Sequence, residues 1–192
     1  LTNPQNDARD VGLALEALGF RVTTLLDATE RELMNAIRDF GSELSRNKGV
    51  GLFYYAGHGI ESEGKNYLIP VDADIRAQDE VRFSSIEMGF VLSKMESARN
   101  PTNIVILDAC RDNPLPAEAR SAGSRGLSIV EAPTGSLIVY ATQPGNVAAD
   151  GSGRNSPFTE AFLELVATPD VDVELMFRTV RQSVMETTGN QQ

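Results

Sequence analysis

The sequence is poor in the residues that form disulfides and bind metal ions. Its 192 residues include one Cys and one His. A single Cys forms no internal disulfide, and a zinc site draws about four ligands mainly from Cys and His. The composition therefore excludes a disulfide scaffold and argues against a metal-dependent hydrolase. The lone Cys and the lone His must be judged by their local contexts.

Long apolar runs and an excess of basic residues are also lacking. No stretch approaches the roughly 18 apolar residues of a membrane span, and residues 1–20 lack the features of a signal peptide. Lys and Arg total 17 against 27 Asp and Glu, which gives a net charge of −10. We therefore expect no nucleic-acid partner and no membrane partner, whereas a cationic ligand would be attracted. We expect a soluble protein, with the cytoplasm as the favoured compartment.

Hydrophobic residues make up 41% of the chain, which is enough for one domain with a sizeable core. Strand-like and helix-like segments alternate, which is typical of an α/β domain with a mostly parallel central sheet flanked by helices. The predicted strands cover residues 21–26, 50–56, 67–71, 103–107 and 135–141, and the predicted helices cover residues 4–18, 29–44, 85–98, 157–167 and 172–187.

The lone His and the lone Cys each follow a predicted buried strand. His58 lies in Tyr-Ala-Gly-His-Gly after strand 50–56, and Cys110 lies in Asp-Ala-Cys-Arg after strand 103–107. Ligands bind open parallel sheets beyond the carboxyl ends of the strands, so both residues are expected at the edge that carries chemistry. A Cys thiol, with a pKa of about 8.5, needs a neighbouring base, which the imidazole would supply. The pattern indicates a His58–Cys110 dyad, with the backbone amides of Gly59 and Cys110 as an oxyanion hole.

These two motifs also carry a resemblance to a known family. Tyr-Ala-Gly-His-Gly, followed about 50 residues later by Asp-Ala-Cys-Arg-Asp, resembles the caspase, metacaspase and paracaspase group of cysteine peptidases. Tyr-Ala-Thr-Gln-Pro-Gly at 140–145 resembles the turn that follows a strand in caspases. The chain looks most similar to bacterial paracaspase-type members. The resemblance implies a three-layer caspase-like fold and a cysteine endopeptidase that works through an acyl-enzyme thioester.

The resemblance also implies how the single domain is divided. Residues 1–110 would form a larger part that holds the dyad, 111–134 a linker loop, and 135–192 a smaller part. Family members begin with an apolar strand that precedes the segment matching residues 1–6, so we expect that strand to be missing from this chain.

The predicted linker contains basic residues. Caspases are cut in this linker, where the chain carries Arg120 and Arg125. One hypothesis is therefore self-cleavage at these two residues. The other is a loop that shapes the substrate pocket and is never cut.

Three aspartates stand where the family's specificity residues are expected. Caspases have Gln where this chain has Asp108 and a substrate-binding Arg where it has Asp150, and paracaspase-type enzymes have an Asp that matches Asp7. Carried over, Asp7, Asp108 and Asp150 would line the primary specificity pocket, which would suit Arg or Lys and reject Asp. The alternative is that Asp7 caps the first helix and the other two are turn residues.

The partners implied are protein or peptide substrates with Arg or Lys before the cut. A homodimer is left open, because caspases pair through an edge strand. The alternative function is a catalytically silent caspase-like interaction module, but the retention of both the His and the Cys favours the enzyme.

No cofactor is predicted. Metacaspases, by resemblance, often need calcium, and one acidic cluster could supply oxygen ligands. Its order lacks the Gly and the closing Glu of an EF-hand loop, so a solvated surface loop is favoured. The cluster consists of Asp72, Asp74, Asp79 and Glu80.

Overall fold

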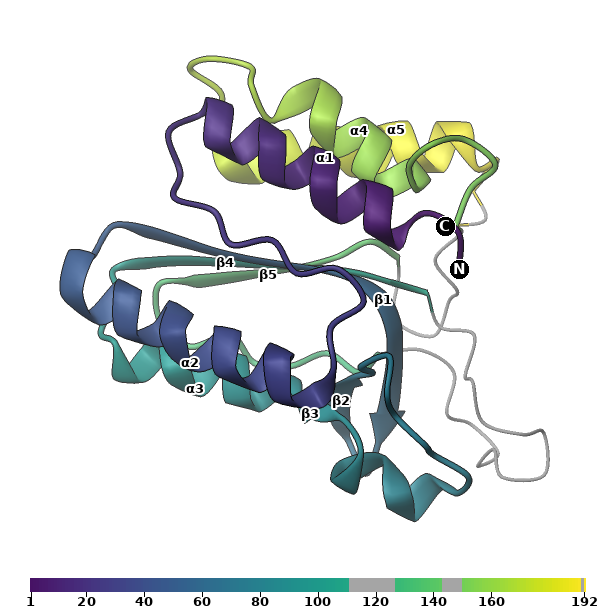
Figure 1. The fold of residues 1–192 in the computed structure, drawn as a ribbon. Coiled ribbons are helices and arrows are strands. Elements are labelled where there is room, and N and C mark those ends of the chain that lie inside the picture. Colours follow the sequence, from purple (N-terminus) through teal and green to yellow (C-terminus); the bar gives the residue numbers. More distant parts are fainter. Residues whose placement is uncertain (111–126, 143–149, 191) are drawn as a thin grey trace.

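The computed structural model describes residues 1–110, 127–142, 150–190 and 192, and for Cys110 it describes the backbone. In this part of the chain a five-stranded sheet lies between two layers of helices (Figure 1), which confirms the predicted α/β class. In chain order the elements are α1 (Pro4–Ala17), α2 (Glu30–Asn47), β1 (Val50–Ser62), β2 (Lys65–Leu68), the 3-10 helix η1 (Gln78–Phe83), β3 (Ile86–Glu87), α3 (Met88–Ser97), β4 (Thr102–Cys110), β5 (Ser136–Tyr140), α4 (Pro157–Leu165) and α5 (Val173–Thr187).

The sheet has the strand order β3-β2-β1-β4-β5 and is mixed. β4 lies between β1 and β5 and runs parallel to both. β2 pairs antiparallel with the last residues of β1, from Gly59↔Leu68 to Ser62↔Lys65, and β3 pairs antiparallel with β2. The sheet is therefore parallel over β1, β4 and β5, as predicted, and antiparallel on one flank.

Each face of the sheet has its own hydrophobic core. Val105, Leu107 and Ala109 of β4 belong to the core formed with α2 and α3. Ile104 and Ile106 belong to the core formed with α1, α4 and α5. Figure 1 shows these two helical layers on opposite sides of the strands. Because side chains alternate along a strand, both cores hold β4 in place.

Two strands are longer than the sequence predicts, and this matters for the site. The first was expected to end at residue 56, but β1 continues through the Gly-His-Gly motif to Ser62. The second was expected to end at residue 107, but β4 continues to Cys110. Pairing with β2 and β4 overrides the low strand propensity of glycine here. His58 and Cys110 therefore lie within strands rather than in the loops beyond them.

The predicted strand at 21–26 is wrong. The structure assigns no strand to these residues, and none of the described strands pairs with them. A strand needs a hydrogen-bonded neighbour, which β-branched composition alone does not provide. Leu25 and Leu26 are 39% and 36% exposed, while Val22 packs against the core of α1, α4 and α5.

The helix starts follow the capping signals of the sequence. Thr29 and Glu32 form a capping box at α2, since the side chain of each accepts from the backbone N–H of the other. Asp172 caps α5, and Ser156, followed by Pro157, caps α4. Among the described residues, no helix is both long enough and apolar enough to cross a membrane.

Candidate active site

β1 and β4 bring the lone His and the lone Cys side by side. The two strands are parallel and paired from Val50↔Thr102 to His58↔Cys110. Neighbouring strands lie about 4.8 Å apart, so the backbones of His58 and Cys110 are adjacent. The structure thus brings together the two residues that the sequence singles out. Their catalytic roles stay predictions.

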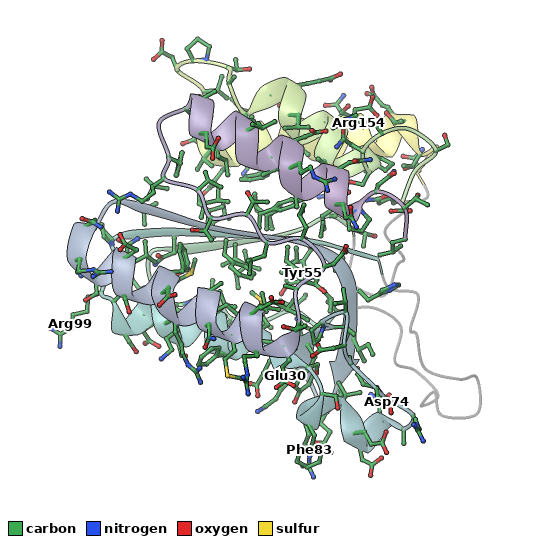
Figure 2. All side chains as sticks on the ribbon, in the orientation of Figure 1. Glu30, Tyr55, Asp74, Phe83, Arg99 and Arg154 are labelled. Atoms are coloured by element: carbon green, nitrogen blue, oxygen red, sulfur yellow. The ribbon has the colours of Figure 1, made fainter. Side chains whose placement is uncertain are left out.

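The backbone of His58 is held by Tyr55 and Ile69. The Tyr55 hydroxyl is within donating distance of two carbonyl oxygens, at 2.9 Å from that of His58 and 3.0 Å from that of Ile69. The Ile69 N–H also donates to the His58 oxygen at 3.0 Å. Burial raises the pKa of Tyr55, which keeps the hydroxyl a neutral donor. Figure 2 marks Tyr55, which packs toward the α2–α3 side of the sheet.

Gly57 makes room for this tyrosine. A Cβ at Gly57 would lie 2.7 Å from the Tyr55 Oη and 2.9 Å from its Cζ, closer than real Cβ contacts. A side chain at this position would push Tyr55 away from the His58 carbonyl. The glycine before the histidine therefore serves the local positioning of His58.

Gly59 is one of the two predicted oxyanion donors and is buried. It pairs with Leu68 of β2, and a Cβ there would lie 3.1 Å from Leu127 Cδ2 and 3.2 Å from Ala109 Cβ. The close packing leaves little room for a side chain. The second predicted donor is the backbone N–H of Cys110. Both donor roles stay predictions.

Asp108 is buried in β4, two residues before Cys110, and is 5% exposed. The hydroxyls of Ser156 and Thr159 donate to its Oδ2, the latter at 2.8 Å, and the Tyr54 Oη lies 3.4 Å from the same oxygen. Burial raises the pKa of the Asp108 carboxyl, although these hydrogen bonds act to lower it. Asp108 is therefore a buried strand residue held by hydroxyl groups, not the turn residue of the alternative interpretation.

Asp7 lies in the first turn of α1 and is 2% exposed. Its Oδ1 accepts from the Ser156 N–H at 3.0 Å and from the Asn155 Nδ2 at 3.1 Å. Burial, reinforced by the charge of Asp108, raises the pKa of Asp7 to about 6, although the bond from Ser156 acts to lower it. These bonds lead to the start of α4, so Asp7 does not cap its own helix.

Asp150 differs from Asp7 and Asp108 because its carboxylate accepts hydrogen bonds from the N-terminal segment. Thr2 donates to its Oδ2 from the backbone N–H at 2.6 Å and from the hydroxyl at 2.8 Å, and the Asn3 N–H donates to its Oδ1 at 3.3 Å. Burial acts to raise the pKa of Asp150, but these hydrogen bonds bring it below its ordinary value. The charge of Asp150 raises the pKa of both Asp7 and Asp108, so the three carboxylates lie near one another.

Sequence reasoning missed the residues that hold these acids. Ser156 and Thr159 both donate to Asp108, and Tyr54 lies 2.7 Å from the Thr159 hydroxyl. Ser before Pro157 is a helix-start signal, so the capping role of Ser156 was open to prediction. Its bond to Asp108 joins residues 48 positions apart, which no local pattern reveals.

Three of the four residues of the predicted acidic cluster use carboxylate oxygens in bonds within the protein. Asp72 accepts from the Glu30 N–H at 2.8 Å, Asp74 from the Arg76 guanidinium at 2.8 Å, and Glu80 from the Arg76 N–H at 2.7 Å. In the part of the chain that the structure describes, no group of three or more His, Cys, Asp or Glu could hold a metal ion. The expectation that no cofactor is needed stays a prediction.

Some sequence predictions lie outside the described residues. Arg120 and Arg125, the predicted self-cleavage residues, are among them, as are residues 143–145 of the predicted turn. The described end of the linker, residues 127–134, contains neither helix nor strand.

Comparison with known proteins identifies the family. The sequence profile of the caspase domain matches residues 1–192. Mucosa-associated lymphoid tissue lymphoma translocation protein 1 of Homo sapiens and its Mus musculus homolog are each 38% identical to the chain over 112 residues. The aligned segment is 58% of this chain and 13% of each relative, so the chain spans a small part of their length. The profile covers the whole chain, and the chain therefore belongs to the caspase-domain family of cysteine peptidases.

Proposed function

We propose that this chain is a cysteine endopeptidase in which His58 and Cys110 form the catalytic dyad. The observation that carries the proposal is the β1–β4 register, which pairs these two residues. The sequence has no other Cys and no other His, so thiol–imidazole chemistry within the chain must use this pair. Membership of the caspase-domain family supports the same assignment.

The reaction proceeds by acyl transfer. The His58 imidazole takes the proton of the Cys110 thiol, and the thiolate attacks the carbonyl carbon of the scissile peptide bond. The backbone N–H groups of Gly59 and Cys110 stabilise the oxyanion that forms. The C–N bond then breaks, His58 gives its proton to the leaving amine, and a thioester remains. Water, deprotonated by His58, hydrolyses the thioester and restores the thiol.

The residue before the cut is Arg, with Lys as the weaker substrate. Asp7 and Asp108 support this choice because they are buried acids whose donors, among the described residues, are amide and hydroxyl groups rather than a cation. Asp150 adds a third negative charge nearby. A guanidinium can meet two carboxylates with parallel hydrogen bonds, whereas an ammonium is a point charge. An Asp side chain would be repelled by the same charges.

A panel of fluorogenic peptides tests the proposal. The peptides differ only in the residue before the cut (Arg, Lys, Gln or Asp) and are incubated with and without a chelator. We expect cleavage after Arg, slower cleavage after Lys and none after Asp, with no effect of the chelator. Equal rates for the Arg and Asp peptides would remove the specificity. Failure to cut any peptide would favour the silent interaction module.

Substitutions of the dyad test the mechanism. Cys110→Ala should abolish cleavage and leave thermal unfolding almost unchanged. His58→Ala should cost nearly as much, and the double variant no more, because the two residues act as a unit. Comparable turnover by the Cys110→Ala protein would exclude the mechanism.

Self-cleavage belongs to the same proposal, since Arg120 and Arg125 match the proposed specificity. Purified wild-type protein should give fragments ending at these residues, and Cys110→Ala should stay intact. An unchanged intact mass in active enzyme would exclude it.

A further inference from the structure

Ser156 contacts both buried acids through different atoms. Its hydroxyl donates to Asp108 Oδ2, and its backbone N–H donates to Asp7 Oδ1 at 3.0 Å. The hydroxyl oxygen also accepts from the Thr159 N–H at 2.9 Å, as the N-cap of α4. One residue at the start of α4 therefore links an acid of β4 to an acid of α1, and the helix in turn fixes its side chain.

The hydroxyl protons near Asp108 have a single consistent arrangement. A hydroxyl has one proton to donate. Thr159 donates its proton to Asp108 at 2.8 Å, so the Tyr54 proton is shared between the Thr159 hydroxyl at 2.7 Å and Asp108 Oδ2 at 3.4 Å. Ser156 also donates its proton to Asp108. Oδ2 of Asp108 is thus used in hydrogen bonds within the protein.

The second oxygen of each acid takes no part in these bonds. Asp108 accepts from Ser156 and Thr159 through Oδ2, which leaves Oδ1 outside the hydroxyl network. Asp7 accepts from Ser156 and Asn155 through Oδ1, which leaves Oδ2 outside it. Within the described part of the chain, each carboxylate is therefore held through one oxygen, and Ser156 is the residue common to both.

We propose that Ser156 is a positioning residue for substrate recognition. By holding one oxygen of Asp108 and one of Asp7, it presents the other two to the basic side chain before the cut. This inference rests on the function proposed above and extends it. Without the Ser156 hydroxyl, Asp108 keeps the bond from Thr159 but is held less firmly about its terminal torsion, which has a broad energy profile, and the match to a planar guanidinium is weakened.

The charges around Asp108 make the same hydroxyl important for its ionisation. Among the described residues, the ionisable groups that interact with Asp108 include Asp7 of α1, Asp150 and the neutral Tyr54 of β1. Burial and the charge of Asp150 raise the pKa of Asp108, and the bond from Ser156 lowers it. Loss of the hydroxyl should therefore raise that pKa further. As the pH falls, Asp108 should then take up a proton, and recognition of a cation should weaken, at a higher pH than in the wild type.

Ser156→Gly is the variant that tests this role. Glycine is nearly as good an N-cap as serine and keeps the backbone N–H that bonds to Asp7, so mainly the hydroxyl is lost. Ser156→Thr keeps a hydroxyl and serves as the rescue. Asp172→Ala is the matched control, because it removes the α5 cap that accepts from the N–H groups of Glu174 and Leu175.

The expected result separates recognition from stability. Ser156→Gly should raise KM for the Arg peptide about 10- to 100-fold, the loss expected for one hydrogen bond to a charged group, with a much smaller change in kcat. It should also reduce the preference for Arg over Lys and move the acid limb of kcat/KM to higher pH. Ser156→Thr should restore all three quantities. Asp172→Ala should lower Tm and leave them unchanged. Wild-type values in Ser156→Gly, or the same changes in Asp172→Ala, would overturn the inference.

A binding experiment keeps this inference distinct from the proposed function. Calorimetric titration with Nα-acetyl-arginine amide compares the Cys110→Ala protein with its Ser156→Gly double variant. If the wild type cuts no peptide but the double variant binds this probe more weakly, the proposed function fails and the positioning role stands. Equal affinity of the two proteins, or no binding to either, would overturn the positioning role.

Discussion

Two aspartates of α1, one turn apart, are treated by the fold in opposite ways. Asp10 accepts from Arg154 Nε and Nη2, both at 2.9 Å, and this hydrogen-bonded ion pair holds the pKa of Asp10 below its usual value. Asp7 accepts from Ser156 and Asn155, and burial raises its pKa to about 6. Figure 2 marks Arg154 on the α1 side of the sheet.

The difference bears on the proposed recognition of a basic side chain. Neutral donors satisfy the oxygen atoms of a buried carboxylate but leave its charge without a counterion. Asp10 has a counterion from within the chain, whereas the partners of Asp7 and Asp108 among the described residues are neutral groups. A substrate guanidinium would supply the missing charge. The proposed arrangement has a cost, because the charged form of the buried Asp7 destabilises the folded state.

The largest expected effect in this comparison is that of Asp108→Asn. The amide oxygen can still accept from the Ser156 and Thr159 hydroxyls, so the fold should be kept. A guanidinium would lose its charged partner, and transition-state binding of the Arg peptide should fall by about 2–5 kcal/mol. Steady-state kinetics measure this loss, and Asp10→Asn is the control. An equal loss in Asp10→Asn would break the distinction between the two acids.

Asp7→Asn should separate stability from activity. The pKa of Asp7 is raised to about 6 in the folded state. The protein therefore loses stability as the pH rises from the pKa of this carboxyl in the unfolded chain, 3.8, through about 6. Above that pH the charged carboxylate destabilises the fold by roughly 1–3 kcal/mol. Asp7→Asn should therefore raise the free energy of unfolding at pH 8 and lower kcat/KM for Arg peptides. Denaturant titration measures the first effect, and a less stable variant at pH 8 would contradict it.

The pH profile of the wild type should show the same carboxyl. As pH falls through about 6, Asp7 takes up a proton, and kcat/KM for the Arg peptide should fall. A bound guanidinium favours the carboxylate, so the corresponding limb in kcat should lie at lower pH. Asp7→Asn should remove this component of the acid limb. An identical limb in wild type and Asp7→Asn would assign it to another group.

The smallest effect is expected at Arg154. Its side chain is 64% exposed, and exposed ion pairs contribute about 0.2–1 kcal/mol. Arg154→Gln should therefore lower the free energy of unfolding by no more than this amount, and by less at high salt. The kinetics of the Arg peptide should hardly change. A large loss of activity would place Arg154 in the recognition machinery instead.

The sequence was sufficient for the parts of the site that depend on strand order. Buried apolar runs predict β1 and β4, and parallel pairing then brings His58 and Cys110 together. The three aspartates were found by resemblance to a family and do lie near one another. Contacts that join distant segments were not predictable. The hydrogen bond from Thr2 to Asp150 joins residues 148 positions apart in the sequence, and the bond from Ser156 to Asp108 joins residues 48 positions apart.

The error at 21–26 has a related cause. Strand propensity describes a residue's preference for a half-buried, pleated surface, but pairing decides whether a strand forms. Gly57 illustrates the opposite case. Its low strand propensity argues for a loop, yet β1 continues through it because β4 pairs along that side.

The position of β4 between two cores has a consequence for inactivation. Val105 and Leu107 are held from the α2–α3 side, and Ile104 and Ile106 from the α1–α4–α5 side. Melting of either half would release the strand that ends at Cys110. Heat should therefore give no partly unfolded form that still cuts peptides. For the proposed peptidase, the curves for loss of activity and for loss of secondary structure should coincide on heating, so a molecule that has begun to unfold no longer cleaves other proteins.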